Sequence, residues 1–330
     1  MKGMAVNNPH PEQKPWLRFA TWFSGFLLFA GLILLVTHFS ELEQFAELLR
    51  HAKPKWLMLA ALLQVTTYIS VAGVWYLSLR QLGEPHSLLS LIPLGIAKLF
   101  SDQAMPSGGI SGTAFLIAAL GRLGVKTPMC MAILLLSLVT YYGAYLLASL
   151  ATIFLLWFYH HAINGWIIVL FTIFWIFAVG VPAGALWIRH FGGKELPPLL
   201  LRIPGLKKLF FAFIDAPIEL LKNPALVIAA LLLHGSVFVL DVATLWVALQ
   251  VVGVHCSLWA ITPAFMLASM VATVGPMPLG LGTFEATCVS TLGVLGVPVE
   301  AALAATLILR GFTLWLPMVP GMWLMRQALP

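Results

Sequence analysis

The chain has 330 residues, of which 61% are hydrophobic and only 9% are charged, and its formal net charge is +6. Soluble domains carry about 25% charged residues, so this composition excludes a soluble globular protein and predicts an all-α polytopic membrane protein. The positive charge does not indicate nucleic-acid binding, because the basic residues collect in loops between apolar stretches, where they set orientation and meet anionic lipid.

The membrane spans are predicted from apolar stretches of about 20 residues, the length that crosses the hydrocarbon layer. The first stretch follows a polar N-terminus and lacks a small-residue cleavage site, so we expect a transmembrane helix and not a cleaved signal. Six transmembrane helices are expected, over residues 17–37, 56–80, 127–158, 165–189, 225–251 and 298–325.

Two further apolar stretches, residues 88–121 and 258–294, are each interrupted by a segment rich in glycine and proline. Each interruption leaves two arms that are too short to cross easily, so we expect each stretch to enter the bilayer and return as a re-entrant helical hairpin. Glycines at such a tip let the backbone approach a ligand or a neighbouring helix closely. The glycines singled out here are Gly108, Gly109, Gly280 and Gly282.

A weak internal repeat relates the two interrupted stretches. Residues 105–125 and 277–297 match at nine of 21 positions with a fixed offset of 172, including one proline and the final Leu-Gly-x-Leu-Gly-Val. A span, a hairpin and a span therefore occur twice, over residues 56–158 and 225–325, and the expected topology places the two copies in opposite senses. The sequence thus predicts inverted repeats, the build of many transporters whose site lies near the bilayer midplane.

The Lys and Arg residues predict the topology. They gather in the N-terminal tail and in the segment between residues 189 and 222, so we expect both termini on the cytoplasmic side of the cell inner membrane. Residues 205–222 show helical spacing of apolar side chains and predict an interfacial helix that Pro217 ends or kinks. The single transmembrane domain, residues 1–325, is expected to comprise a tail with the first helix (1–55), the first repeat (56–158), a connection (159–224) and the second repeat (225–325).

Charged side chains inside the predicted spans and hairpins are costly, so each is a functional-site hypothesis. Arg310 lies in the middle of a span and needs an anionic partner, which could be Glu285, Asp241 or a ligand phosphate. Glu285 could hold this arginine, pair with a cationic headgroup or carry a proton. Asp241 shares a helical face with His234, and either a site or a buried Asp–Arg pair that locks the bundle would explain it. We expect His234 to be an interior, hydrogen-bonded histidine, and Lys98 and Asp102 to line the mouth of the first hairpin.

Several motifs resemble the lysylphosphatidylglycerol synthase transmembrane, flippase-like family. They are the string PMPLGLGTFE over residues 276–285, the LGVLGV of residues 292–297 and the Leu-Arg of residues 309–310 before LWLPMVPG. The segment MPSGGISGTAFLIAALGRLGV, residues 105–125, is similar to the Gly-rich motif in the first half of that family. The resemblance covers nearly the whole chain.

The resemblance implies movement of a lipid between leaflets. In the multiple-peptide-resistance members this module carries aminoacylated phosphatidylglycerol to the outer leaflet, and a soluble aminoacyltransferase domain is added. This chain ends at Pro330, so synthase activity is not implied, and we expect no enzyme and no cofactor. The sequence shows none of the motifs of zinc proteases, P-loop enzymes or serine hydrolases.

We therefore expect a lipid translocase of the bacterial cytoplasmic membrane, in which Arg310 contacts a headgroup phosphate and Glu285 orients that arginine or senses the headgroup. The expected partner is a phospholipid, an aminoacylated phosphatidylglycerol or a polyprenyl phosphate, with no nucleic acid, and a homo-oligomer stays open. Two alternatives remain, a secondary transporter of a small anionic solute and a non-transporting membrane partner of a lipid-modifying enzyme. The three cysteines lack Cys-x-x-Cys spacing and are expected to be packing residues.

Overall fold

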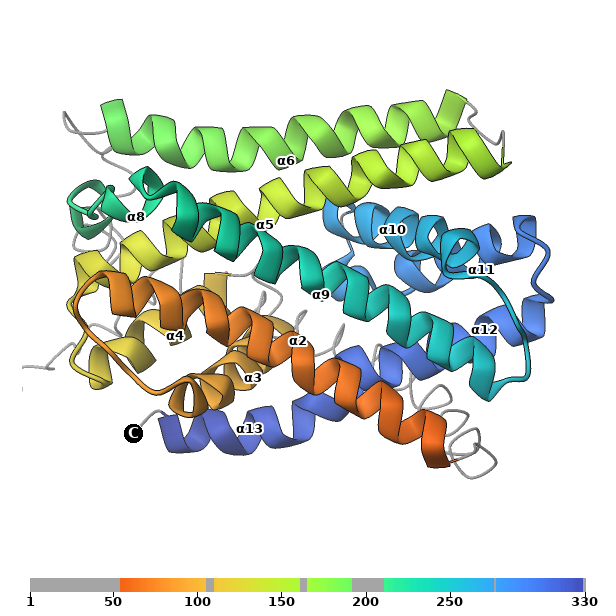
Figure 1. Cartoon of the computed structure of the whole chain (residues 1–330), viewed down its shortest axis with the longest axis horizontal. Coiled ribbons are helices and arrows are strands. Elements are labelled where there is room, and N and C mark those ends of the chain that lie inside the picture. The colour runs from red at the N-terminus through yellow and green to blue at the C-terminus, as the bar shows by residue number, and fades with distance from the viewer. Residues whose placement is uncertain (1–53, 105–109, 161–164, 192–210, 276, 329–330) are drawn as a thin grey trace, which may run out of the picture. The chain divides into compact units, whose positions relative to one another are not determined.

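The computed structural model in Figure 1 describes residues 54–104, 110–160, 165–191, 211–275 and 277–328. Every regular element in these ranges is a helix, which confirms the all-α prediction for this part of the chain. The transmembrane helix expected over residues 17–37 lies outside the described residues.

Five helices among the described residues are long and apolar enough to cross a membrane, and they fall on the other five expected spans. The elements are α2 (Pro54–Gln81), α5 (Thr127–Leu155) with the π-helix η1 (Leu156–His160), α6 (Gly165–Phe191), α9 (Pro224–Val251), and α12 (Val299–Arg310) continued by the π-helix η4 (Gly311–Trp315) and α13 (Leu316–Ala328). Two of the five spans thus include a short π-helix, one at the end of α5 and one between α12 and α13.

The two interrupted stretches each form a pair of shorter helices. In the first pair, α3 (Leu88–Ala104) packs against α4 (Ile110–Arg122). In the second, α10 (Leu258–Val274) packs against α11 (Thr283–Val294), with the short 3₁₀ turn η3 (Pro278–Gly280) between them. The chain therefore reverses at both Gly- and Pro-rich breaks, as the sequence predicts. Whether the pairs are re-entrant depends on the position of the bilayer and stays a prediction.

The helix expected over residues 205–222 is interrupted at Pro217, as the sequence predicts, and its position at the membrane interface stays a prediction. Residues 205–210 lie outside the described part of the chain, and after them the helix ends by residue 214. Residues 215–218 are not helical, and a new short helix, α8, covers Glu219–Lys222. The physical cause is Pro217, which disfavours helical backbone at the residue before it and cannot donate a backbone hydrogen bond.

The two predicted repeats meet along α2 and α9, which lie side by side in close contact (Figure 1). Small and hydroxyl residues permit this approach, because a Cβ atom added at Gly73 would come within 3.2 Å of Leu233. Beside it, the Ser236 hydroxyl donates to the Ser70 hydroxyl at 2.9 Å. The contact thus uses close backbone packing and side-chain hydrogen bonds, the forces that remain available between helices in lipid.

Each helix pair also packs against a span of the other repeat. Helix α3 lies along α13, and α10 packs on α5. Between α5 and α10, the Tyr145 hydroxyl donates to the Ser269 hydroxyl at 2.7 Å. Between α3 and α13, Gly321 lies so close to Phe100 and to the Ile96 carbonyl that a Cβ atom would crowd both. The two helix pairs are therefore fixed in corresponding ways, each to the opposite repeat.

The surface of the bundle is apolar where a soluble protein would be polar. Helix α6 packs on α5 and exposes large apolar side chains along much of its length. Those exposed by more than half include Ile168, Val169, Val179 and Trp187. Such a surface is stable against lipid hydrocarbon and not against water. The interior buries Cys130 and Cys288 completely, which confirms the packing role expected for these two cysteines, and Cys256 is partly buried.

Candidate functional site

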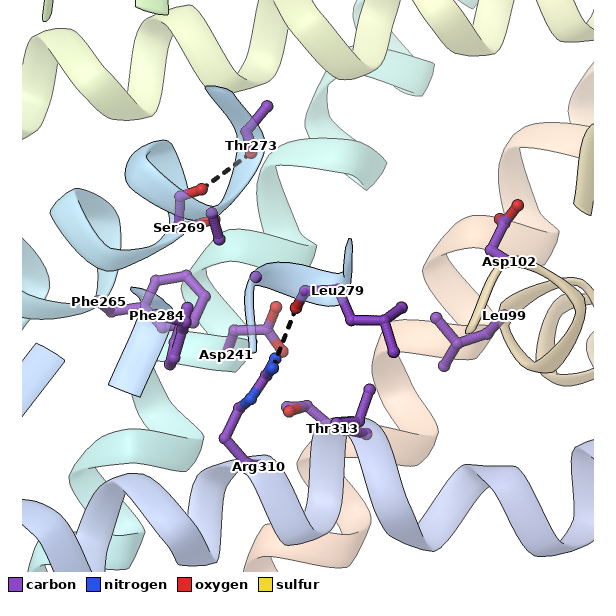
Figure 2. A pocket seen from close by; sticks show the side chains of 13 residues that line it. Leu99, Asp102, Asp241, Phe265, Ser269, Thr273, Leu279, Phe284, Arg310 and Thr313 are labelled. Atoms are coloured by element: carbon purple, nitrogen blue, oxygen red, sulfur yellow. Dashed lines mark hydrogen bonds between the residues drawn. The ribbon is translucent and has the colours of Figure 1, made fainter. Parts of the chain in front are cut away.

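Two adjoining cavities lie where α2, α3, α9 and the two helix pairs meet. Their volumes are about 350 Å³ and 440 Å³. Four residues line both cavities and so mark the junction between them, namely Leu99, Asp102, Asp241 and Thr313. We call the two volumes together the central cavity, with the smaller part next to the second helix pair. Figure 2 shows the smaller part, with Asp241 and Arg310 reaching toward it from different helices.

Arg310 fastens the tip of the second helix pair. Its Nε donates to Glu285 Oε1 at 2.5 Å, and its Nη2 donates to the Leu279 carbonyl oxygen at 3.0 Å. The guanidinium carbon also lies 5.0 Å from the centre of the Phe284 ring, a cation–π distance. The ion-pair side chains are only 11% and 10% exposed. The anionic partner that the sequence requires for Arg310 is therefore Glu285, and the arginine belongs to a span while its partners belong to the tip.

The backbone of this tip adopts conformations that few residues tolerate. Leu279 has a φ of 61°, which costs about 1–2 kcal/mol for a residue with a side chain. Gly280 has a φ of 63°, and an added Cβ atom would collide with Ala272 of α10. The Leu279 carbonyl oxygen is the atom that Arg310 binds, so the arginine stabilises the strained turn directly.

The N-terminus of α11 is already occupied by an anion. Free N–H groups at a helix N-terminus favour an anion. In the structure, the Gly282 N–H donates to Glu285 Oε2 at 2.7 Å. Glu285 therefore joins the tip to a span, because one carboxylate oxygen accepts the Gly282 N–H at the start of α11 and the other holds Arg310 of α12.

The first helix pair carries a different charged arrangement. Lys98 Nζ and Asp102 Oδ2 form an ion pair at 2.7 Å, one helical turn apart on α3. The other carboxylate oxygen, Asp102 Oδ1, accepts the Gly112 N–H of α4 at 2.9 Å. A Cβ atom at Gly112 would collide with this carboxylate. Gly112 is thus required at this position by the close approach of the aspartate, and Asp102 links the two helices of the pair.

Asp241 lies on α9 at the junction of the two parts of the central cavity. Its Oδ1 accepts a hydrogen bond from Gln64 Nε2 of α2 at 3.0 Å. The same amide nitrogen donates to Thr244 Oγ1 at 3.0 Å, which fixes the amide in place. No basic side chain among the described residues lies within ion-pair distance of Asp241. The Asp–Arg lock considered from the sequence is therefore absent between Asp241 and Arg310 in the described structure.

His234 is buried and hydrogen-bonded, as the sequence predicts. Its Nδ1 lies 3.0 Å from the Thr140 hydroxyl of α5. The Tyr141 ring meets the imidazole edge to face, with ring centres 5.8 Å apart. His234, Tyr141 and Asp241 all line the larger part of the central cavity, so the helical face shared by His234 and Asp241 does point inward.

The structure brings most of the predicted site residues to one place. The predicted residues that line the central cavity are Lys98, Asp102, Asp241, Gly280 and Arg310. Glu285 stands behind Arg310, and Gly282 contributes its N–H to the tip without lining the cavity. Gly108 and Gly109 lie outside the described residues.

Sequence reasoning missed most of the uncharged polar and aromatic residues of the cavity wall, among them Gln64, Tyr68, Tyr141 and Thr313. Gln64 offered a signal, because an amide in the middle of an apolar span is rare and needs a partner. Thr313 offered none that periodicity could reveal. It lies in the π-helix η4, directly after Arg310, and this wider winding shifts which side chains face the cavity. Such π-bulges occur often at functional sites.

Comparison with known protein families gives one match. A family model described as "Lysylphosphatidylglycerol synthase TM region" matches residues 22–321. A search of curated proteins gives no match to this chain. The family match spans all the helices described above up to Gly321 in α13.

Proposed function

The chain belongs to the lysylphosphatidylglycerol synthase TM region family, and from this membership we propose that it is a lipid translocase. It moves a phosphate-bearing lipid between the leaflets of the bacterial cytoplasmic membrane. The family membership suggests a flippase-like role in general, and the central cavity supports the more specific assignment.

The observation that carries the proposal is a charged cavity inside an otherwise apolar bundle. Charged side chains from α3, α9 and α12 reach it, although each costs about 2.5–3.5 kcal/mol at the centre of a bilayer. Apolar side chains such as Val71, Leu116 and Leu138 complete the wall. A cavity with few polar groups in an apolar wall suits a headgroup whose acyl chains stay in lipid.

Arg310 is the proposed phosphate contact. Its Nε and Nη2 bind the tip, but its Nη1 has no hydrogen-bond partner among the described residues. This nitrogen belongs to a side chain that lines the smaller part of the central cavity. A guanidinium that is held rigidly by Glu285 loses little conformational freedom when it binds a phosphate oxygen. Lys98 supplies the second positive charge of the cavity.

The packing of the repeats supports movement between two faces. Helix α3 packs on α13 of the second repeat, and α10 packs on α5 of the first. We propose that the two copies form an inverted repeat with two re-entrant hairpins, whose site lies at the interface between the repeats. The two tips would then reach the headgroup from opposite leaflets, with both chain termini in the cytoplasm. Rocking of one repeat against the other would expose the cavity to each leaflet in turn.

Reconstitution in liposomes tests the proposal. The probes are phosphatidylglycerol, phosphatidylethanolamine and a polyprenyl phosphate, each with a fluorophore on an acyl chain or chain end, and a membrane-impermeant reductant reports their leaflet. We expect at least one probe to cross faster than in empty vesicles. If none of the three probes crosses faster than in empty vesicles, the proposal is contradicted. Uptake of a soluble phosphate compound without lipid movement would instead assign a solute transporter.

Arg310→Lys sharpens the same experiment. Lysine keeps the positive charge for Glu285 but lacks the planar fork that reaches Glu285, Leu279 and a phosphate together. We expect the variant to insert and fold, and to move lipid about tenfold more slowly, which corresponds to about 1.4 kcal/mol. Arg80→Lys is the matched control, because Arg80 is exposed in the last turn of α2. Full activity of Arg310→Lys would show that lipid movement does not need the planar guanidinium group.

A further inference from the structure

We infer that Asp241 is a proton-carrying residue, and that the proposed translocase moves a proton together with an anionic lipid headgroup in the same direction. The inference rests on the proposed function and adds the source of energy for lipid movement, which is the proton gradient. It follows from the position of this carboxyl group, from the neutrality of its partners and from the charges around the central cavity.

Asp241 occupies the position that a coupling group needs. It lies well inside the 28-residue helix α9, and it lines both parts of the central cavity. Figure 2 shows its carboxyl group beside the tip of the second helix pair, near Leu279 and Arg310. A group at this junction meets the headgroup and also the water that accompanies it.

The partners of Asp241 do not compensate a negative charge. Gln64 donates one hydrogen bond at 3.0 Å, and its amide is neutral. The other two carboxylates near the cavity are each held by a cation and a backbone N–H. Asp102 has Lys98 and the Gly112 N–H, and Glu285 has Arg310 and the Gly282 N–H.

A buried carboxylate without a cation is expensive, and the cheapest remedy is a proton. Asp102 and Glu285 each have a cation and a backbone N–H that compensate the charged carboxylate. Asp241 alone of the three lacks such a partner in the described structure, so it is the carboxyl group that changes its protonation state.

The surroundings of Asp241 set the charge balance. The titratable side chains that line the central cavity with it come from α2, α3, α5, α9 and α12. They are Tyr68, Lys98, Asp102, Tyr141, His234 and Arg310. With Glu285 behind Arg310 and with His234 neutral, the cavity has one negative charge in excess when Asp241 is ionised. Protonation of Asp241 brings the net charge of the cavity to zero.

This balance couples the proton to the lipid. A headgroup phosphate with one negative charge is repelled by a cavity that is already negative, and is accepted once Asp241 has bound a proton. The step is a simple protonation, in which the carboxylate and a proton from the aqueous side give the carboxylic acid. Gln64 can still donate to the carbonyl oxygen of that acid. On the other face, the proton and the lipid leave together and the carboxylate is restored.

A pH gradient across proteoliposomes tests the coupling. The probe is phosphatidylglycerol labelled on one acyl chain, which carries a phosphate and no amine. For one proton per lipid, we expect the probe to accumulate in the leaflet on the alkaline side, up to about tenfold per unit of pH gradient. If the probe moves but its distribution between the leaflets does not depend on the pH gradient, the inference is overturned and the translocase proposal still stands.

Asp241→Asn is the decisive variant. The asparagine amide has nearly the same shape as the carboxyl group but cannot carry a proton, so we expect the pH gradient to have no effect on the distribution of the probe. Asp215→Asn is the matched control, because Asp215 is exposed in the turn before α8, and it should respond as the native protein does. A native response in Asp241→Asn overturns the inference.

A second probe separates the proton from a lipid amine. If Asp241 instead binds the ammonium group of a headgroup, Asp241→Asn should slow phosphatidylethanolamine and leave phosphatidylglycerol unchanged, without a role for the gradient. That result overturns proton coupling. Movement driven by a sodium gradient at equal pH overturns it as well.

Infrared titration of the purified protein tests the protonation without any transported lipid. We expect a carboxylic-acid carbonyl band that disappears as the pH rises over the range in which the protein stays folded, and that is missing in Asp241→Asn. Identical spectra of the two proteins across this range overturn the inference. If no probe lipid moves but the band titrates as expected, the protonation of Asp241 stands and the proposed function fails for those lipids.

Discussion

The two helix pairs have the same place in their repeats but are held by different charges. In the second pair, the tip is tied to a span, because Arg310 of α12 binds Glu285 and the Leu279 carbonyl oxygen. In the first pair, the charged groups stay within the pair, because Lys98 and Asp102 lie on α3 and Asp102 binds the Gly112 N–H of α4.

The difference indicates that the two helix pairs are attached to the bundle in different ways. The second tip has a strained turn and a buried ion pair that fixes it to the bundle, so it serves as the fixed wall of the cavity. The first pair has a more exposed ion pair, with side chains 28% and 21% exposed. Its charged groups are more exposed, and its contacts with the rest of the described bundle include packing along α13, α2 and α5.

The largest expected effect comes from breaking the tether of the second tip. Arg310→Leu leaves the Glu285 carboxylate buried without its cation and frees the strained turn, and removal of one partner from a buried pair costs about 3–5 kcal/mol. We expect a clear drop in the thermal melting temperature in detergent, together with loss of lipid movement.

The double variant Arg310→Leu with Glu285→Leu separates stability from function. Replacing both charges by apolar groups removes the unpaired carboxylate, so much of the lost stability should return. Lipid movement should not return, because the proposed phosphate contact is gone. Recovery of movement in the double variant would show that Arg310 acts only as a structural tether.

A moderate effect is expected at the link within the first pair. Gly112→Ala places a methyl group where the Asp102 carboxylate lies, so the aspartate must turn away and lose the Gly112 N–H. We expect a loss of about 1–2 kcal/mol of stability and slower lipid movement. Gly121→Ala on the same helix is the matched control, since nothing lies within 4 Å of its added Cβ atom. Thermal melting of both variants checks the difference, and equal melting temperatures would argue against the link.

The smallest effect on stability is expected for Lys98→Met. The Lys98–Asp102 pair is partly exposed and spans one helical turn, and such pairs contribute about 0.3–0.5 kcal/mol. The melting temperature should therefore barely change. The affinity for an anionic headgroup should fall, because the cavity loses one of its two positive charges. A variant that melts normally and also moves lipid at the native rate would exclude Lys98 from the site.

Sequence reasoning predicted the helices well because their length and composition are set by the membrane. The boundaries of α2, α5 and α9 follow from apolar runs that end at polar or proline-containing segments. The charges also indicated which residues line the central cavity, since Arg310, Asp241 and Asp102 are costly in an apolar core, while their functional role stays a prediction. The interruption of the helix at residues 215–218 has a local cause that the sequence shows, because Pro217 stops the helical backbone although the helical spacing of apolar side chains continues.

The partners within the site could not be predicted from the sequence. The sequence gives the depth of Arg310 and Asp241 but not the rotation of their helices, so Glu285 and Asp241 were equal as partners for the arginine. The π-helix after Arg310 breaks the 3.6-residue period and turns Thr313 into the cavity. The hydrogen bond between Gln64 and Asp241 joins residues 177 positions apart, and no local pattern indicates it.

The most direct test of the central claim is an electron cryomicroscopy structure of the protein in a nanodisc that contains phosphatidylglycerol. We expect density for one headgroup in the central cavity, with its phosphate near Arg310 or Lys98 and its acyl chains leaving between helices toward the bilayer. A cavity that opens to water on one face only, with lipid density confined to the outer surface of the bundle, would contradict the account.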